Sequence, residues 1–246
     1  MEDVHRGGLL KTRAICADIL CRIVKRCRVC GRPLQGQCAH LCPDCAQYFT
    51  LYTSGFCPMC GRLYQRKEKY LCADCRRSPR PWSKLGFFGP YEGILQDVLL
   101  EFKFGAKLEW SSLLRFVLAQ TIGFHFPDHH SITVVPVPSH PTRIRERGMN
   151  QSLELAKMVA RIMGRDLLCG ALIRTRPTPP QSRLSRTQRM QNLKKAFRAP
   201  KNSFAGKDVL LVDDVMTTGS TVAACTKTIL RAGAERVSVL VVAVAE

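Results

Sequence analysis

Eight of the thirteen cysteines in this 246-residue chain form one pattern that is written twice, and this repeat restricts the fold more than any other feature. The first copy comprises Cys27, Cys30, Cys42 and Cys45, and the second copy comprises Cys57, Cys60, Cys72 and Cys75. Each cysteine of the second copy lies thirty residues after its counterpart, and the flanking letters repeat as well (VCGRPL and MCGRLY, LCPDC and LCADC). Two residues between cysteines let a tight turn aim both sulfurs at one ion, so the spacing predicts closed, structural zinc sites.

The sequence leaves the grouping of these cysteines open. The simplest assignment takes each copy as one tetrahedral site and predicts two zinc ions, but a cross-braced pairing or a single zinc also satisfies the spacing. Free or disulfide-bonded cysteines fit the repeat poorly. Cys38 or His40 could replace a ligand, although both are more simply bystanders. The remaining cysteines lie in apolar contexts and are expected to be ordinary thiols: Cys16, Cys21, Cys169 and Cys225.

The chain is expected to have three segments. Residues 1–26 form a basic extension, expected to be helical, which lacks the apolar stretch of a signal peptide. Residues 27–80 form the zinc-binding module, which is too short to bury a large core and should need its metal to fold. The stretch RRSPRPWSK (76–84) is interpreted as a linker that leads into the main domain, 81–246. No uncharged apolar run is long enough for a membrane span, and metal-type cysteine pairs fit a reducing, cytoplasmic location.

The main domain alternates strands with helices. Strands are predicted at 85–91 (with a turn), 131–138, 208–212 and 236–245, and helices at 92–103, 107–122, 151–164 and from 220 to near Gly233. A near-continuous apolar strand such as DVLLV (208–212) is typical of a buried parallel sheet. The predicted fold class is therefore α/β, a parallel sheet flanked by helices, with ligands bound beyond the carboxyl ends of the strands.

The stretch VLLVDDVMTTGST (209–221) places two carboxylates at the end of that strand and a hydroxyl-rich loop before the next helix. Backbone N–H groups at a helix N-terminus bind phosphate, and Gly219 lets the backbone approach it closely. Asp213 and Asp214 suit a vicinal diol, or a Mg²⁺ ion held through water. A phosphate beside a diol describes ribose 5-phosphate. A helix cap would need only one aspartate, and this stretch has neither the P-loop nor the Rossmann glycine pattern.

The same stretch resembles the type I phosphoribosyltransferases over all thirteen residues, and residues 27–246 resemble the ComF/GntX family, bacterial proteins linked with DNA uptake during competence. The other matching motifs, besides the cysteine pairs, are FKFG (102–105), VPVPSHPTRIRERGMNQS (135–152), RTRPTPPQSRLSRTQRMQN (174–192) and AF (196–197). The resemblance implies a phosphoribosyltransferase-like domain that binds phosphoribosyl pyrophosphate (PRPP) together with Mg²⁺.

The resemblance also implies roles for single residues. Asp213 and Asp214 would bind the ribose hydroxyls. The 5-phosphate would be surrounded by Thr217, Thr218, Gly219, Ser220 and Thr221. Contacts to the pyrophosphate are expected from the loop after VVPVP and from a flexible segment that closes over it: Arg143, Arg145, Arg147, Gly148, Asn150, Arg174, Gln181 and Arg189. Cationic side chains there would stabilise the charge on the leaving pyrophosphate, whereas no catalytic base is assigned.

Two departures from related salvage enzymes concern the acceptor. Thr217 stands where the 6-oxopurine enzymes place the aspartate that serves the purine base, which argues against a hypoxanthine- or guanine-type enzyme. Few residues follow the last predicted strand, so residues 85–110 or the zinc module are expected to supply any hood over an acceptor. The sequence therefore supports a ligand, PRPP, better than it supports a particular transfer reaction.

The formal net charge of +19 favours polyanionic partners. Residues 167–207 hold ten Lys or Arg and no Asp or Glu. A solvated loop explains some of these charges. Binding of single-stranded nucleic acid, with bases stacked on Phe197 and Phe204, would explain more of them.

Two hypotheses about function follow. The first is a PRPP- and single-stranded-DNA-binding factor that acts in DNA uptake and natural transformation, with other competence proteins as partners. The second is an active phosphoribosyltransferase that transfers ribose 5-phosphate to an unidentified base or amine and releases pyrophosphate.

Overall fold

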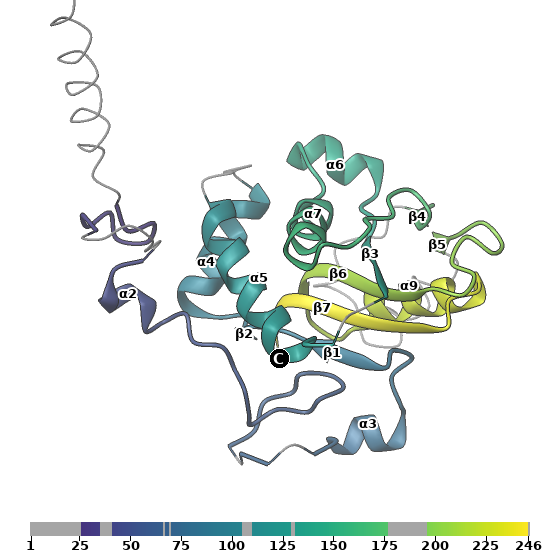
Figure 1. The fold of residues 1–246 in the computed structure, drawn as a ribbon, viewed down its shortest axis with the longest axis horizontal. Helices are drawn as coiled ribbons and strands as arrows, with labels where there is room; N and C mark the ends of the chain where they lie inside the picture. The colour runs from purple at the N-terminus through teal and green to yellow at the C-terminus, as the bar shows by residue number, and fades with distance from the viewer. Residues whose placement is uncertain are drawn as a thin grey trace, which may run out of the picture. The chain divides into compact units, whose positions relative to one another are not determined.

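The computed structural model describes residues 26–34, 41–65, 67–68, 70–104, 110–128, 131–176 and 196–245 (Figure 1). Contacts within the chain divide it into two compact units, Met1–Tyr48 and Phe49–Glu246. Several positions singled out from the sequence lie outside the described residues: the extension 1–25 with Cys16 and Cys21, then Cys38, His40, Gln181 and Arg189.

The first cysteine copy lies in the smaller unit. Its second pair flanks the start of α2 (Pro43–Ala46), with Cys42 before the helix and Cys45 within it. Pro43 occupies the first helical position, where its missing N–H removes no helical hydrogen bond.

The second cysteine copy belongs to the larger unit, which therefore begins earlier than the domain start expected at residue 81. The physical reason is packing on both sides of this copy. Before it, Phe56 is buried and its ring meets Phe87 edge to face, with centroids 4.8 Å apart. After it, Trp82 is buried and its Nε1 donates a hydrogen bond to Met59 O at 2.8 Å. The stretch interpreted as a linker is thus anchored to the core through Trp82.

A parallel sheet forms the centre of the larger unit (Figure 1). Its strands are β1 (Lys84–Gly86), β2 (Gly89–Pro90), β3 (Ile132–Pro136), β6 (Asp208–Met216) and β7 (Arg236–Val244). Their order is β1-β7-β6-β3, β2 also pairs with β7, and every pairing is parallel. A separate antiparallel pair is formed by β4 (Ile173–Arg174) and β5 (Phe197–Arg198). The predicted α/β class with a parallel sheet is confirmed.

The helices of the larger unit are α3 (Ala73–Arg77), α4 (Gly93–Phe104), α5 (Ser111–His125), α6 (Pro141–Arg147), α7 (Gln151–Met163) and α9 (Ser220–Arg231). The segment of α6 was expected to be a loop. His140 caps this helix by accepting a hydrogen bond from Thr142 N, Pro141 occupies its first turn, and Gly148 ends it at φ 78°. Among the described residues, no helix has the length and apolar character that a bilayer span requires.

Helices pack on the sheet through the apolar side chains of β6. The inward residues of α9, among them Val222 and Ile229, join one buried cluster with Val209 and Leu211 of β6. Successive side chains of a strand alternate between its two faces, so β6 offers a second set of apolar side chains. α7 packs against β3 and β6, and α5 packs beside α7. The sheet is therefore flanked by helices, as predicted.

The expectation that Phe197 and Phe204 stack on nucleic-acid bases is wrong for the protein as folded. Phe204 is completely buried and Phe197 is 6% exposed, both within the cluster that α9 covers. The backbone holds this segment in place, since Phe204 N donates a hydrogen bond to Ala232 O at 3.1 Å. An apolar ring in a charged segment is more often an anchor to the core than an exposed platform.

Candidate functional site

The paired aspartates lie near the carboxyl end of β6, at the edge of the sheet where parallel α/β folds bind ligands. Ser152 Oγ, in the first turn of α7, donates a hydrogen bond to Asp213 Oδ1 at 2.7 Å. Asp214 Oδ1 accepts a hydrogen bond from Val215 N at 2.7 Å, and Lys103 Nζ lies 3.4 Å from Asp214 Oδ2. Two different helices, α7 and α4, therefore contact the two carboxylates.

The carboxyl group of Asp213 has a raised pKa. Burial, and next the charge of Asp214, raise the pKa of Asp213 to about 7, while the hydrogen bond from Ser152 opposes the rise. Near neutral pH the Asp213 carboxyl is therefore only partly ionised. The two carboxyl groups together accept hydrogen bonds from neutral hydroxyl groups and repel a phosphate placed directly on them.

Sequence reasoning assigned no role to Lys103 or Ser152. Both lie inside quoted motifs, Lys103 in FKFG and Ser152 at the end of VPVPSHPTRIRERGMNQS. Each is far from Asp213 in sequence, so their contacts with the aspartates arise only when α4 and α7 pack near the end of β6. The motifs indicated that Lys103 and Ser152 belong to matching segments, but they did not indicate which residues these two side chains contact.

The loop after β6 has the geometry of an anion site. Gly219 adopts φ 72° at the N-cap of α9, a conformation that glycine accepts without strain. The hydroxyls of Thr218 and Ser220 lie 2.9 Å apart and are hydrogen-bonded to each other. The first N–H groups of α9 have no partner within the helix, and the helix dipole adds positive potential at this end.

A cleft of about 230 Å³ joins this loop to the aspartates and to a group of cations. The cationic side chains that line it are Lys103 from α4, Arg143 and Arg147 from α6, and Arg174 from β4. Burial, and next the charge of Arg143, lower the pKa of both Arg147 and Arg174. A bound anion offsets the repulsion between these neighbouring cations, so the cleft suits a ligand that carries both phosphate groups and hydroxyl groups.

The other residues predicted from the sequence are placed differently. Arg145 is exposed on α6, two positions from both Arg143 and Arg147, and helix positions two apart do not share a face. Gly148 ends α6. Asn150 precedes α7 and its Oδ1 accepts a hydrogen bond from Ser139 Oγ at 3.1 Å, so it fixes the backbone beside the cleft.

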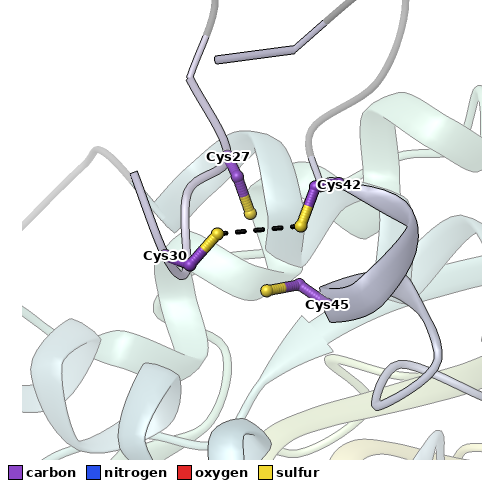
Figure 2. Close-up of side chains that lie close together, drawn as sticks. All are labelled: Cys27, Cys30, Cys42 and Cys45. Atoms are coloured by element: carbon purple, nitrogen blue, oxygen red, sulfur yellow. Dashed lines mark hydrogen bonds between the residues drawn. The ribbon is translucent and has the colours of Figure 1, made fainter. Parts of the chain in front are cut away.

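The cysteines are grouped in sequence order, as the simplest assignment predicted. In each copy the four sulfurs lie within 4.8 Å of one another. Figure 2 shows the first copy, with four side chains converging and a contact of 3.7 Å between the sulfurs of Cys30 and Cys42. The matching contact in the second copy, between Cys60 and Cys72, is 3.6 Å. The cross-braced pairing is therefore wrong.

The repeat extends beyond the cysteines. Asp44 forms an ion pair with Arg32 in the first copy, and Asp74 forms one with Arg62 at 2.8 Å, thirty residues later. Each pair links the turn of the first two cysteines to the helix that carries the last. The two copies are thus built alike, including side chains outside the cysteine clusters.

A larger cavity of about 650 Å³ lies beside the aspartate cleft, and Thr217 lines both. One wall is the end of the sheet, at Val244 and Ala245. The second cysteine copy, from Cys60 to Leu63, forms another part of the lining. Both parts belong to the larger unit.

Comparison with known proteins finds several relatives, among them the following three. DNA utilization protein YhgH of Escherichia coli K12 is 35% identical over 170 residues, which is 66% of this chain and 73% of the relative. The protein of the same name from Salmonella typhimurium is 33% identical over 220 residues, 87% of this chain and 94% of the relative. Competence protein F of Haemophilus influenzae is 32% identical over 163 residues, 64% and 71% of the two chains.

A family model described as a phosphoribosyl transferase domain matches residues 149–245, the part of the chain that holds the paired aspartates and the loop after them. The relatives extend the similarity over most of the chain. The chain therefore belongs to the ComF/YhgH family and carries a phosphoribosyltransferase domain together with two four-cysteine clusters.

Proposed function

We propose that this protein binds Mg-PRPP in the aspartate cleft. The observation that carries the proposal is that one cleft of about 230 Å³ is lined by the loop before α9, by two carboxylates and by arginines. The loop would hold the 5-phosphate, Asp213 and Asp214 the ribose hydroxyls, and Arg143, Arg147 and Arg174 the pyrophosphate. Mg²⁺ would neutralise part of the pyrophosphate charge, with the two aspartates reaching it through water.

We further propose one structural zinc ion in each cysteine cluster. In a tetrahedral site with Zn–S bonds of about 2.3 Å, the sulfurs lie about 3.8 Å apart. The sulfur contacts of 3.7 and 3.6 Å fit this geometry. Four thiolates leave no open position, so the metal would stabilise the fold and take no part in a reaction.

The affinity for PRPP should depend on pH through Asp213. A carboxylate accepts hydrogen bonds from both ribose hydroxyls, whereas a carboxylic acid offers fewer acceptors. Because the pKa of Asp213 is about 7, affinity should rise about tenfold per pH unit below that value and level off above it. Isothermal titration with Mg-PRPP across this range measures the effect. The phosphates of PRPP also titrate, so Asp213→Asn is the control; an equally steep rise in that variant would contradict the role of Asp213.

The relatives support a role in DNA uptake. Two of them are named for DNA utilization and one for competence. We infer that this protein acts in natural transformation in the cytoplasm, where it binds single-stranded DNA and works with other competence proteins. Its net charge of +19 suits that partner, and Arg198, Lys201 and Lys207 of the basic tract are exposed.

Binding to single-stranded DNA should weaken steeply with salt. About four phosphate contacts would give a slope of about −3 when the logarithm of affinity is plotted against the logarithm of salt concentration. Fluorescence anisotropy with a labelled oligonucleotide measures this slope. A flat salt dependence, or no retention on single strands at low salt, would remove DNA from the proposal.

The alternative function is phosphoribosyl transfer, which the larger cavity favours. A cavity of about 650 Å³ that shares Thr217 with the aspartate cleft offers room for an acceptor base or amine beside the ribose. Its wall of cysteine-cluster residues would serve as the hood. The carboxylate on the described lining, Asp74, is paired with Arg62, so the acceptor would have to lose its proton without help from Asp74. Incubation with Mg-PRPP and a panel of bases, amines and oligonucleotides, followed by measurement of released pyrophosphate, tests turnover.

A further inference from the structure

Arg80 lies between the second cysteine cluster and the loop after β6. Arg80 lines the larger cavity together with Cys60 of the second cluster and Thr218 of the loop. Its Nη1 donates to Thr218 O in a long contact of 3.4 Å. Its guanidinium lies 5.7 Å from the centre of the Trp82 ring. One side chain therefore lies beside the second cluster and contacts the proposed phosphate loop.

Trp82 makes a second connection. Its Nε1 donates to Met59 O, inside the turn between Cys57 and Cys60. Its ring lies against the loop so closely that a Cβ on Gly219 would be 3.1 Å from Trp82 Cη2. The indole ring of Trp82 thus lies between the cysteine turn and the N-cap of α9 and contacts both.

The turn of the second cluster also contacts the sheet, at the end of β7. A Cβ on Gly61 would be 2.7 Å from Val244 Cγ1, so the turn touches the end of β7. Residues 61 and 244 therefore fix the distance between the cluster and the edge of the sheet where the loop begins. The first cluster belongs to the other compact unit and lies outside this set of contacts.

We propose that the second cysteine cluster, acting through Arg80 and Trp82, positions the 217–221 loop for PRPP, and that the first cluster has no such role. Arg80 is a positioning residue: the turn of the second cluster holds Trp82 through Met59 O, and Arg80 lies against the Trp82 ring while its Nη1 reaches Thr218 O. Without that anchor the loop would have to be ordered when the ligand binds, which costs affinity. This inference rests on the proposed binding of PRPP.

The test compares Arg80→Ala with Arg76→Ala, which removes the same charge from an exposed position on α3. Arg80→Ala should weaken Mg-PRPP binding about tenfold, the loss typical of one hydrogen bond from a charged donor, while zinc content stays unchanged. Arg76→Ala should bind like the unaltered protein. Isothermal titration and metal analysis by mass spectrometry supply the two readouts.

Trp82→Phe is the second variant, since it keeps an aromatic ring at this position and removes the donor to Met59 O together with the outer edge of the indole that lies against Gly219. It should weaken PRPP binding about threefold, as expected for one neutral hydrogen bond. Affinity equal to that of the unaltered protein in both Arg80→Ala and Trp82→Phe would overturn the inference. If the unaltered protein does not bind PRPP at all, the proposed function fails instead, so the two failures can be told apart.

Discussion

Replacing both Asp213 and Asp214 with asparagine should abolish measurable PRPP binding and leave the fold intact. The two carboxylates are proposed to accept the ribose hydroxyls, and losing two charge-assisted interactions should weaken binding at least about a hundredfold. Asparagine keeps an Oδ1 acceptor for Ser152 Oγ and for Val215 N, so the local hydrogen bonds survive. Isothermal titration with Mg-PRPP measures the loss, and circular dichroism reports the fold.

The same variant should be more stable than the unaltered protein at neutral pH. The pKa of Asp213 is raised from 3.8 to about 7 on folding, so this group lowers the free energy of unfolding as pH rises through that window. Asparagine does not titrate and removes that cost. Asp208→Asn is the control, because Asp208 lies at the other end of β6 in an ion pair with Arg236. Unchanged PRPP affinity in the double variant would contradict the assignment of the site.

Replacing one cysteine of the second cluster should remove one metal ion, lower the free energy of unfolding and weaken PRPP binding. The unaltered protein should contain about two zinc ions per chain, and Cys72→Ser should lower this to about one. Losing about 4 kcal/mol of stability, a typical scale for a lost metal site, would lower the unfolding midpoint by about 10 °C in a chain of this size. PRPP affinity should fall as well, because the second cluster lies against the loop.

The matched variant is Cys42→Ser, the same position of the repeat thirty residues earlier. It should also lose about one zinc ion, but PRPP affinity should remain that of the unaltered protein, because the contacts that hold the loop come from the second cluster. Equal loss of PRPP binding in both variants would refute the division of roles. A zinc content near one in the unaltered protein would instead require a new ligand list.

Local patterns predicted much of the larger unit. A buried strand is predicted from the apolar run DVLLV. An amphipathic helix is predicted from QSLELAKMVARIMG, and it ends at Gly164, which adopts φ 61°. These elements depend on periodicity and on caps, both of which are local properties of the chain. The grouping of the cysteines into one cluster per copy was also predicted, as the simplest of the alternatives. The tight turn within each Cys-x-x-Cys pair aims both sulfurs at the same site.

Packing across long sequence distances was not predictable in the same way. The second cysteine copy looks identical in kind to the first, yet Phe56 and Trp82 bind it into the larger unit. α6 was missed because an arginine-rich segment has no apolar stripe, although Pro141 and Gly148 marked its two ends. Phe197 was expected to be exposed because charged residues surround it in the sequence. It is buried because β5, which contains it, pairs with β4.

The duplicated glycine of the two cysteine turns has a consequence for how the copies can diverge. Gly31 and Gly61 have the same backbone conformation, at φ 72° and 73°. A Cβ on Gly31 would meet no atom within 4 Å among the residues that the structure describes, whereas a Cβ on Gly61 would collide with Val244. Asparagine, which tolerates this backbone conformation, is therefore an acceptable replacement at 31 but not at 61. Two copies with the same signature thus face unequal constraints, and the first is the freer to change over evolution.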